Sequence, residues 1–157
     1  MNSSRLNEYS RSVATRLLHA MPDLEAHARI DDTPGVQDGC LLIEVPSANP
    51  RAQGNLLLTT DDDEITVIWN GWHTHLNSWC SPDADEVKTV VDLLRSIFEE
   101  RFVISVTMEG ETWKGSSGGA PGEVHATLER NRPKLAAGMR EYALSWKGTY
   151  DMEIRAS

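Results

Sequence analysis

Two histidines, His73 and His75, are the residues of this sequence best placed to bind a metal ion. In a strand, residues two apart share a face, so both imidazoles can reach one ion. Cys80, Asp83 and Asp85 follow closely enough to complete such a site. The sequence offers neither an HExxH motif nor a Cys-x-x-Cys pair, and neutral histidines packed between tryptophans explain the same residues. We therefore expect no cofactor, and we keep a metal-dependent hydrolase centred on His73 and His75 as the alternative function.

Residues 115–119 match the letters of G-x-S-x-G, the nucleophile elbow of many hydrolases. That elbow needs a strand, a sharp turn and a helix, followed in chain order by an acidic residue and a histidine. Here Ala-Pro-Gly follows at residues 120–122, which is poor helix material, and His125 precedes Asp151. We predict a glycine-rich loop over residues 115–122 and assign no catalytic residue.

Acidic residues gather in two short segments, residues 61–64 and residues 83–86. The first lacks the spacing of a calcium-binding EF-hand, and the second suits the positive end of a helix dipole. Residues 21–111 carry 18 acidic and 5 basic residues, whereas the whole chain has a formal charge of −9. Such a balance excludes a general nucleic-acid or anionic-membrane binder, because those surfaces recruit Lys and Arg. It favours a basic protein partner.

The periodicity of apolar residues predicts two main helices, one over residues 4–20 and one that begins at Ser81 and ends near residue 100. The segments between and after them read as short strands, at residues 24–30, 40–45, 55–60, 64–69, 102–108, 111–114, 142–146 and 150–154. Asn70-Gly71 predicts either a two-residue hairpin turn or a glycine bulge in a continuing strand. Residues 123–140 stay ambiguous. We expect one α+β domain over residues 1–157, with a mostly antiparallel twisted sheet of six to eight strands.

The two cysteines, Cys40 and Cys80, are too few for a disulfide framework and are expected to be small buried hydrophobic residues. The N-terminal residues lack the apolar core of a secretory signal, and the chain has no apolar run of about 18 residues. We therefore expect a cytoplasmic protein without a membrane span. Five tryptophans are many for 157 residues, and those near acidic turns could serve as binding anchors.

Two stretches resemble small immunity proteins that accompany bacterial polymorphic and contact-dependent toxins: EITVIWNGWHTHL at residues 64–76 and SWKGTYD at residues 145–151. The resemblance implies a non-enzymatic, cytosolic protein that binds and neutralises a toxin domain, and it implies no catalytic residue. Our leading hypothesis is accordingly a protein-binding immunity module. The residues expected to contact its partner are Asp61, Asp62, Asp63, Glu64, Trp72, His73, His75, Asp83 and Asp85.

Overall fold

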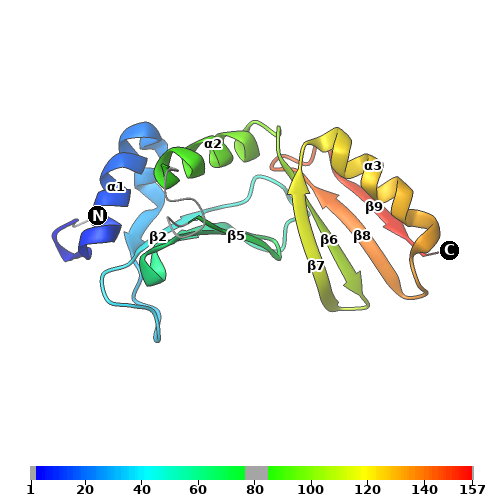
Figure 1. Cartoon of the computed structure of the whole chain (residues 1–157), viewed down its shortest axis with the longest axis horizontal. Helices are drawn as coiled ribbons and strands as arrows, with labels where there is room; N and C mark the ends of the chain where they lie inside the picture. The colour runs from blue at the N-terminus through cyan, green and yellow to red at the C-terminus, as the bar shows by residue number, and fades with distance from the viewer. Residues whose placement is uncertain (1–2, 77–84, 157) are drawn as a thin grey trace. The chain divides into compact units, whose positions relative to one another are not determined.

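The computed structural model describes residues 3–76 and 85–156, and it confirms the α+β class (Figure 1). The chain forms two compact units. Unit 1 comprises residues 1–46, 55–69 and 73–93, and unit 2 comprises residues 47–54, 70–72 and 94–157. Two compact units can together make one domain, so the single domain expected over residues 1–157 stays a prediction.

Unit 1 contains a five-stranded sheet whose strands follow one another in chain order, β1-β2-β3-β4-β5. The strands are β1 (Ala28–Ile30), β2 (Leu41–Val45), β3 (Leu56–Thr59), β4 (Ile65–Trp69) and β5 (Trp72–Leu76). The pairs β1–β2, β2–β3 and β3–β4 are antiparallel. Alternate residues of β3 and β4, such as Leu58 and Val67, are fully buried, because strand side chains point to opposite faces in turn.

The connection between β4 and β5 is the two-residue turn Asn70-Gly71. Both residues have positive φ angles, 49° and 85°, as a type I′ hairpin turn requires. Asn70 also accepts a hydrogen bond on Oδ1 from the backbone N–H of Gln53, at 2.6 Å. Of the two alternatives that the sequence left open here, the hairpin is therefore the correct one.

Two α-helices follow the predicted apolar stripes. The first, α1 (Glu8–Ala20), is preceded by a short 3₁₀ turn, η1 (Ser3–Arg5), and is capped by the Asn7 side chain, which accepts from the N–H of Ser10. The second, α2 (Glu86–Phe98), belongs to unit 1 up to Leu93. The cap expected at Ser81 lies outside the described residues. Within the described part, no helix is long and apolar enough to cross a membrane.

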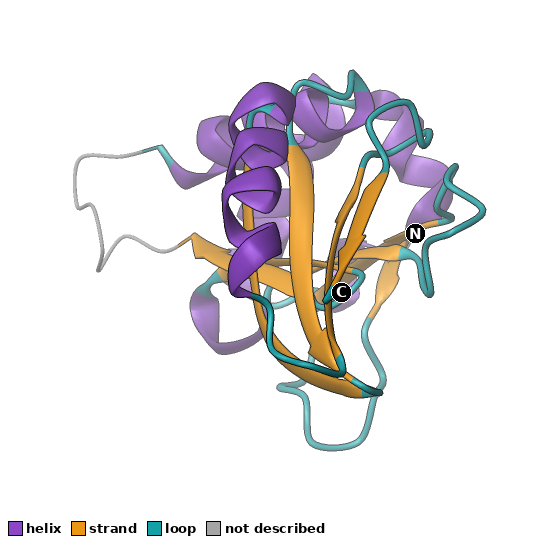
Figure 2. Ribbon diagram, turned by 90° about the vertical axis from the view of Figure 1, so that its right-hand side faces the viewer, coloured by secondary structure: helices purple, strands orange, loops and turns teal. Residues whose placement is uncertain are grey.

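Unit 2 contains a four-stranded antiparallel sheet in the order β7-β6-β8-β9. Its strands are β6 (Val103–Glu109), β7 (Thr112–Gly119), β8 (Met139–Leu144) and β9 (Met152–Arg155). The helix α3 (Pro121–Asn131) lies along one face of this sheet, and the 3₁₀ turn η4 (Arg132–Lys134) follows it (Figure 2). In the hydrophobic core of unit 2, Val124 and Leu128 of α3 pack with Val103, Ala143 and Ile154 of the strands.

Three predictions of local structure were wrong. Residues 22–27 form the 3₁₀ helix η2 (Pro22–His27), so only Ala28–Ile30 of the strand expected over residues 24–30 is extended. The strand predicted over residues 111–114 continues as β7 through residues 115–119, which were expected to be a loop, and Pro121 opens α3, because a proline is well suited to the first helical position. The strands also form two sheets, where the sequence predicted one. The helix α3 is a third helix beside the two main helices that were predicted.

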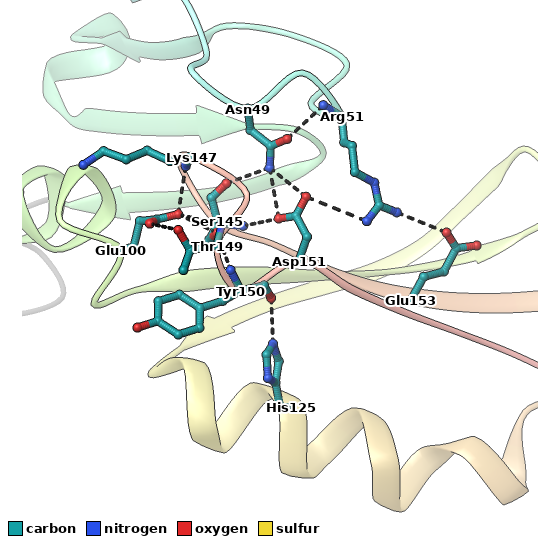
Figure 3. A network of polar contacts seen from close by, with 10 residues as sticks. All are labelled: Asn49, Arg51, Glu100, His125, Ser145, Lys147, Thr149, Tyr150, Asp151 and Glu153. Carbon is teal, nitrogen blue, oxygen red and sulfur yellow. Dashed lines mark hydrogen bonds and ion pairs between the residues drawn. The ribbon is translucent and has the colours of Figure 1, made fainter.

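A buried carboxylate organises the end of α2 and the loop between β8 and β9, all within unit 2 (Figure 3). Glu100 has a left-handed backbone, with φ 58°, at the position after a helix that glycine usually occupies. Its carboxylate accepts hydrogen bonds from the hydroxyls of Ser145 and Thr149, both at 2.6 Å, and from the N–H groups of Lys147 and Thr149. These four bonds offset the backbone strain and the burial of a charge.

The same loop is held from its other side by Asn49. Its amide nitrogen donates to the carbonyl of Ser145 at 2.7 Å and to both carboxylate oxygens of Asp151 at 3.0 Å. Asp151 in turn accepts from the N–H of Ser145, and Arg51 reaches Glu153 at 3.2 Å. His125 of α3 contributes one further bond, from Nε2 to the carbonyl of Tyr150.

We predict that Glu100→Gln destabilises the chain by about 2 kcal/mol, because an amide cannot accept all four of these hydrogen bonds. Burial alone raises the pKa of Glu100, but the bonds from Ser145, Thr149 and Lys147 outweigh it and lower the pKa to about 2. A carboxyl whose pKa is lowered in the folded state stabilises the fold above its unfolded pKa, and this stabilisation is lost as the pH falls toward the folded value.

Urea unfolding of both proteins between pH 7 and pH 2 tests this expectation. The difference between the two should be constant near neutral pH and should shrink below about pH 4.5. Glu99→Gln is the matched control, since Glu99 is exposed and its one ion pair within the described residues is with the nearby, exposed Arg101. Equal stability of the Glu100 and Glu99 variants at pH 7 would contradict the assigned role.

Candidate functional site

The acidic segment predicted to contact a partner forms a 3₁₀ turn, η3 (Asp61–Asp63), between β3 and β4. Asp62 and Asp63 are exposed, and both have positive φ angles, 55° and 53°, which aspartate tolerates better than most residues. The turn is fixed by the residue before it: the buried hydroxyl of Thr60 lies 2.6 Å from the hydroxyl of Ser10 in α1 and accepts from the N–H of Leu41.

Several carboxylates converge at this end of unit 1, around Tyr9. The Tyr9 hydroxyl donates to Glu86 Oε2 at 3.1 Å. The pKa of Tyr9 is raised above its usual range, mainly by burial, then by Glu86, and further by Asp63 and Glu64. Residues far apart in the sequence therefore act on one phenol, so these acids share one region of the surface.

The Cys40 thiol, which contacts the acidic turn, lies in the same region of negative charge. Cys40 is fully buried, as expected, and its thiol donates to the Thr60 carbonyl and to Asp61 Oδ1 at 3.6 and 3.7 Å. Burial, followed by Asp61, Asp31 and Asp63, raises the pKa of Cys40 to about 11. The thiolate is therefore suppressed, and Cys40 is no candidate nucleophile.

An open groove of about 450 Å³ lies in this acidic region. Its lining residues are Asn7, Glu8, Tyr9, Ser12, Gln37 and Asp63, and we call it the acidic groove. Within the part of the chain that the structure describes, no Lys or Arg forms an ion pair with Glu8, Asp61, Asp62 or Asp63. The groove thus presents negative charge to solvent.

The net negative charge of the chain comes from unit 1. By sequence, unit 1 has 15 acidic and 5 basic residues, a formal charge of −10, whereas unit 2 has 9 acidic and 10 basic residues, a charge of +1. Three of the basic side chains of unit 1 are engaged in ion pairs, namely Arg16 with Asp85, Arg29 with Glu44, and Lys88 with Asp92.

Asp85 lies at the start of α2, as the fit of residues 83–86 to the positive end of a helix dipole predicted. Its carboxylate accepts from the N–H of Lys88 at 3.0 Å, three residues on, as a helix N-cap does, and it pairs with Arg16. The Lys88 N–H and then Arg16 lower its pKa. Asp85 is therefore committed to the start of α2. Asp83, also named as a partner contact, lies outside the described residues.

His73 and His75 lie on the same face of β5, as their spacing predicts, and both are exposed. Their ring centroids are 5.2 Å apart, and His75 Nδ1 lies 2.5 Å from Glu64 Oε1. Over residues 3–76 and 85–156, no group of three or more His, Cys, Asp or Glu could hold a metal ion. Cys80 and Asp83, which were to complete such a site, lie outside these ranges.

Trp72 is not available as an exposed anchor. Its side chain is only 7% exposed, and its ring packs against Phe102 with centroids 5.3 Å apart. Among the described tryptophans, Trp113 is the one that is largely exposed, at 48%. The spacing of tryptophans and turns in the sequence did not separate these two environments.

The serine of the G-x-S-x-G match, Ser117, lies inside β7, not on a sharp turn. Its hydroxyl is 2.7 Å from that of Ser105 on the neighbouring strand, while His125 is bonded to the Tyr150 carbonyl. A strand and a helix do flank this motif, contrary to our prediction, but the geometry of a nucleophile elbow is absent at Ser117.

Glu8 and Tyr9 are functional candidates that the sequence analysis missed. Tyr9 reads as one more member of the apolar stripe of the first helix, and Glu8 as a first-turn acid. Their position beside the 61–63 turn depends on the packing of α1, so no local pattern could have identified them.

We predict that Asp62→Gly yields a more stable protein than Asp62→Ala, by about 1 kcal/mol. Both substitutions remove the same charge, but only glycine adopts a left-handed backbone without steric cost. Urea unfolding at neutral pH measures the difference, and Asp62→Asn serves as a charge control. An alanine variant as stable as the glycine variant would show that the left-handed conformation at this residue does not hold in solution.

Replacing Thr60 by valine should destabilise the chain by about 2 kcal/mol, because the Leu41 N–H and the Ser10 hydroxyl both lose a buried partner. The control is Thr15→Val, since Thr15 is exposed and its hydroxyl donates to the Arg11 carbonyl of its own helix. Thermal and urea unfolding provide the comparison, and a loss no greater than that of the control would refute the assigned role of Thr60.

Comparisons of the chain with protein-family models, with curated proteins and with solved structures returned no match. The features of this chain that bear on its function are the acidic groove, the turn beside it and the exposed histidines of β5.

Proposed function

We propose that this chain is a protein-binding module that neutralises a basic protein, most concretely an immunity protein that binds a bacterial toxin domain. One observation carries the proposal. Acids from α1, the 61–63 turn and the start of α2 converge around an open groove, and no lysine or arginine of the described chain pairs with those of the turn.

The negative charge of this groove favours a cationic partner. Exposed carboxylates without neighbouring cations repel one another, so they lower stability unless a cationic partner compensates them. A lysine or arginine side chain of a partner could enter the acidic groove between Glu8 and Asp63, with Tyr9 beside it. A protein surface of net negative charge also accelerates encounter with a basic partner, and this effect weakens as salt is added.

The exposed face of β5 extends the same surface. The exposed rings of His73 and His75 offer a partner both apolar carbon atoms and hydrogen-bonding nitrogen atoms. The hydrogen bond to Glu64 holds the ring of His75 in place. The exposed side chain of Ile68, on the adjacent strand β4, adds an apolar contact. A mixed surface of this kind, with charges around apolar and aromatic side chains, is typical of protein interfaces.

The proposal predicts that reversing two charges, in the double variant Asp62→Lys and Asp63→Lys, abolishes protection against a toxin. The test co-expresses the chain with candidate toxin domains from the genes that neighbour its own and measures bacterial growth. Binding of the purified proteins by calorimetry should weaken at least roughly thirtyfold in the double variant. Binding of the unchanged chain should weaken by about tenfold between 50 and 300 mM salt.

The matched control is the double variant Asp23→Lys and Glu25→Lys, which makes the same charge change on η2 of the same unit. Both side chains are exposed and lie outside the groove lining. This control should still protect the cells and bind within about threefold of the unchanged chain. Equal loss in both double variants would show that net charge alone acts, and full protection by the Asp62 and Asp63 variant would refute the proposed surface.

A further inference from the structure

Two arginines face each other across neighbouring strands of the unit 2 sheet. Arg140 of β8 and Arg155 of β9 are direct partners in the antiparallel register. Side chains in such a pair lie on the same face with their Cβ atoms about 5 Å apart, and two like charges there destabilise a sheet. The pair is therefore unfavourable by itself and becomes favourable when an anion lies between the two guanidinium groups.

The hydrogen bonds of Arg140 are incomplete. Its Nε is buried and has no hydrogen-bond partner within the described chain. Its terminal nitrogen forms one long ion pair, 3.7 Å from Glu111 Oε1, and that glutamate side chain is 94% exposed. A buried guanidinium N–H without an acceptor destabilises the fold, and an oxyanion that accepts from it would remove this cost.

Arg155 offers the second donor set. Its Nε donates to Glu153 Oε1 at 2.7 Å, and its terminal nitrogens form no hydrogen bond or ion pair within the described residues. The other oxygen of Glu153 accepts from Arg51 at 3.2 Å, so this carboxylate is already shared and does not neutralise the arginine pair fully.

A cavity of about 300 Å³ lies at the arginine pair. Arg140 and Arg155 line it together with Glu111 and the glycines of two turns, Gly110 and Gly138. Both glycines have positive φ angles, 56° and 84°, and a side chain at either would meet only open space. The cavity is at the lower end of the range for small-molecule sites, large enough for a small anion or for the acidic end of a larger ligand.

We propose that Arg140 and Arg155 bind the oxyanion group, a carboxylate or a phosphate, of a small ligand in this cavity. Guanidinium groups bind both anions through paired N–H donors, and a partly buried site strengthens such bonds. Glu111 competes for Arg140 when the site is empty. This site belongs to unit 2 and is independent of the acidic groove.

Nuclear magnetic resonance of the full chain tests the proposal with two probes, inorganic phosphate and acetate, at constant ionic strength set with chloride. The arginine Nε–H resonances are followed during each titration. We expect saturable shifts at Arg140 and Arg155, and the stronger probe identifies phosphate or carboxylate as the preferred anion. Absence of a saturable shift with both probes would overturn the proposal.

Three variants separate anion binding from a structural ion pair. Arg140→Gln should weaken binding of the preferred probe at least roughly tenfold, and Arg155→Gln, at a more exposed side chain, should do the same. Glu111→Gln removes the competing carboxylate and should tighten binding, whereas a purely structural Arg140–Glu111 pair predicts no tightening.

The matched control is Arg130→Gln, which removes the same charge from an exposed position on α3, where Arg130 bonds to Thr127. It should leave binding within about twofold of the unchanged chain. Equal weakening by the Arg130, Arg140 and Arg155 variants would show a diffuse charge effect and would refute a built site. Urea unfolding of each variant verifies that it is folded.

Discussion

The buried hydroxyl pair of Ser10 and Thr60 connects the parts of unit 1 on which the candidate site depends. Thr60 directly follows β3, accepts from the N–H of Leu41 in β2 and contacts Ser10 of α1, so one side chain sets the position of the helix against two strands. The acidic turn starts at the next residue, and the groove residues Glu8 and Tyr9 directly precede Ser10 in α1. A polar contact inside an apolar core is directional, so it fixes these positions more sharply than apolar packing does.

Three carboxylates of this chain show how the environment decides what an acid does. Glu100 is buried and has four donors, so it remains charged and holds a loop together. Asp85 has a helix N-terminus and an arginine, so its charge is used locally. Asp62 is exposed, and no Lys or Arg among the described residues forms an ion pair with it, so its charge faces the solvent. Only an exposed carboxylate such as Asp62 contributes to the electrostatic potential outside the protein, which attracts an approaching basic protein.

The sequence predicted the elements whose patterns are local. The apolar runs at residues 40–45, 55–60 and 64–69 predicted β2, β3 and β4 to within one residue at each end, and the apolar stripe of residues 4–20 predicted α1. The sequence did not predict α3. Pro121 and Gly122 favour a break in regular structure, yet the helix that starts there buries Val124 and Leu128 in the core of unit 2. The convergence of Glu8, Tyr9 and Glu86 on the 61–63 turn arises from tertiary packing, which single-sequence periodicity does not contain. For the same reason Trp72 could not be recognised as buried.

The two consecutive left-handed aspartates of the 61–63 turn have a consequence for how this chain tolerates genetic change. Glycine or asparagine relieves such a backbone, so a library of variants screened for heat resistance alone should lose the acids at these two sites early. Under the proposed function, a library screened for survival against the toxin should keep them. The composition of the turn in survivors of the two screens would therefore distinguish selection for folding from selection for recognition.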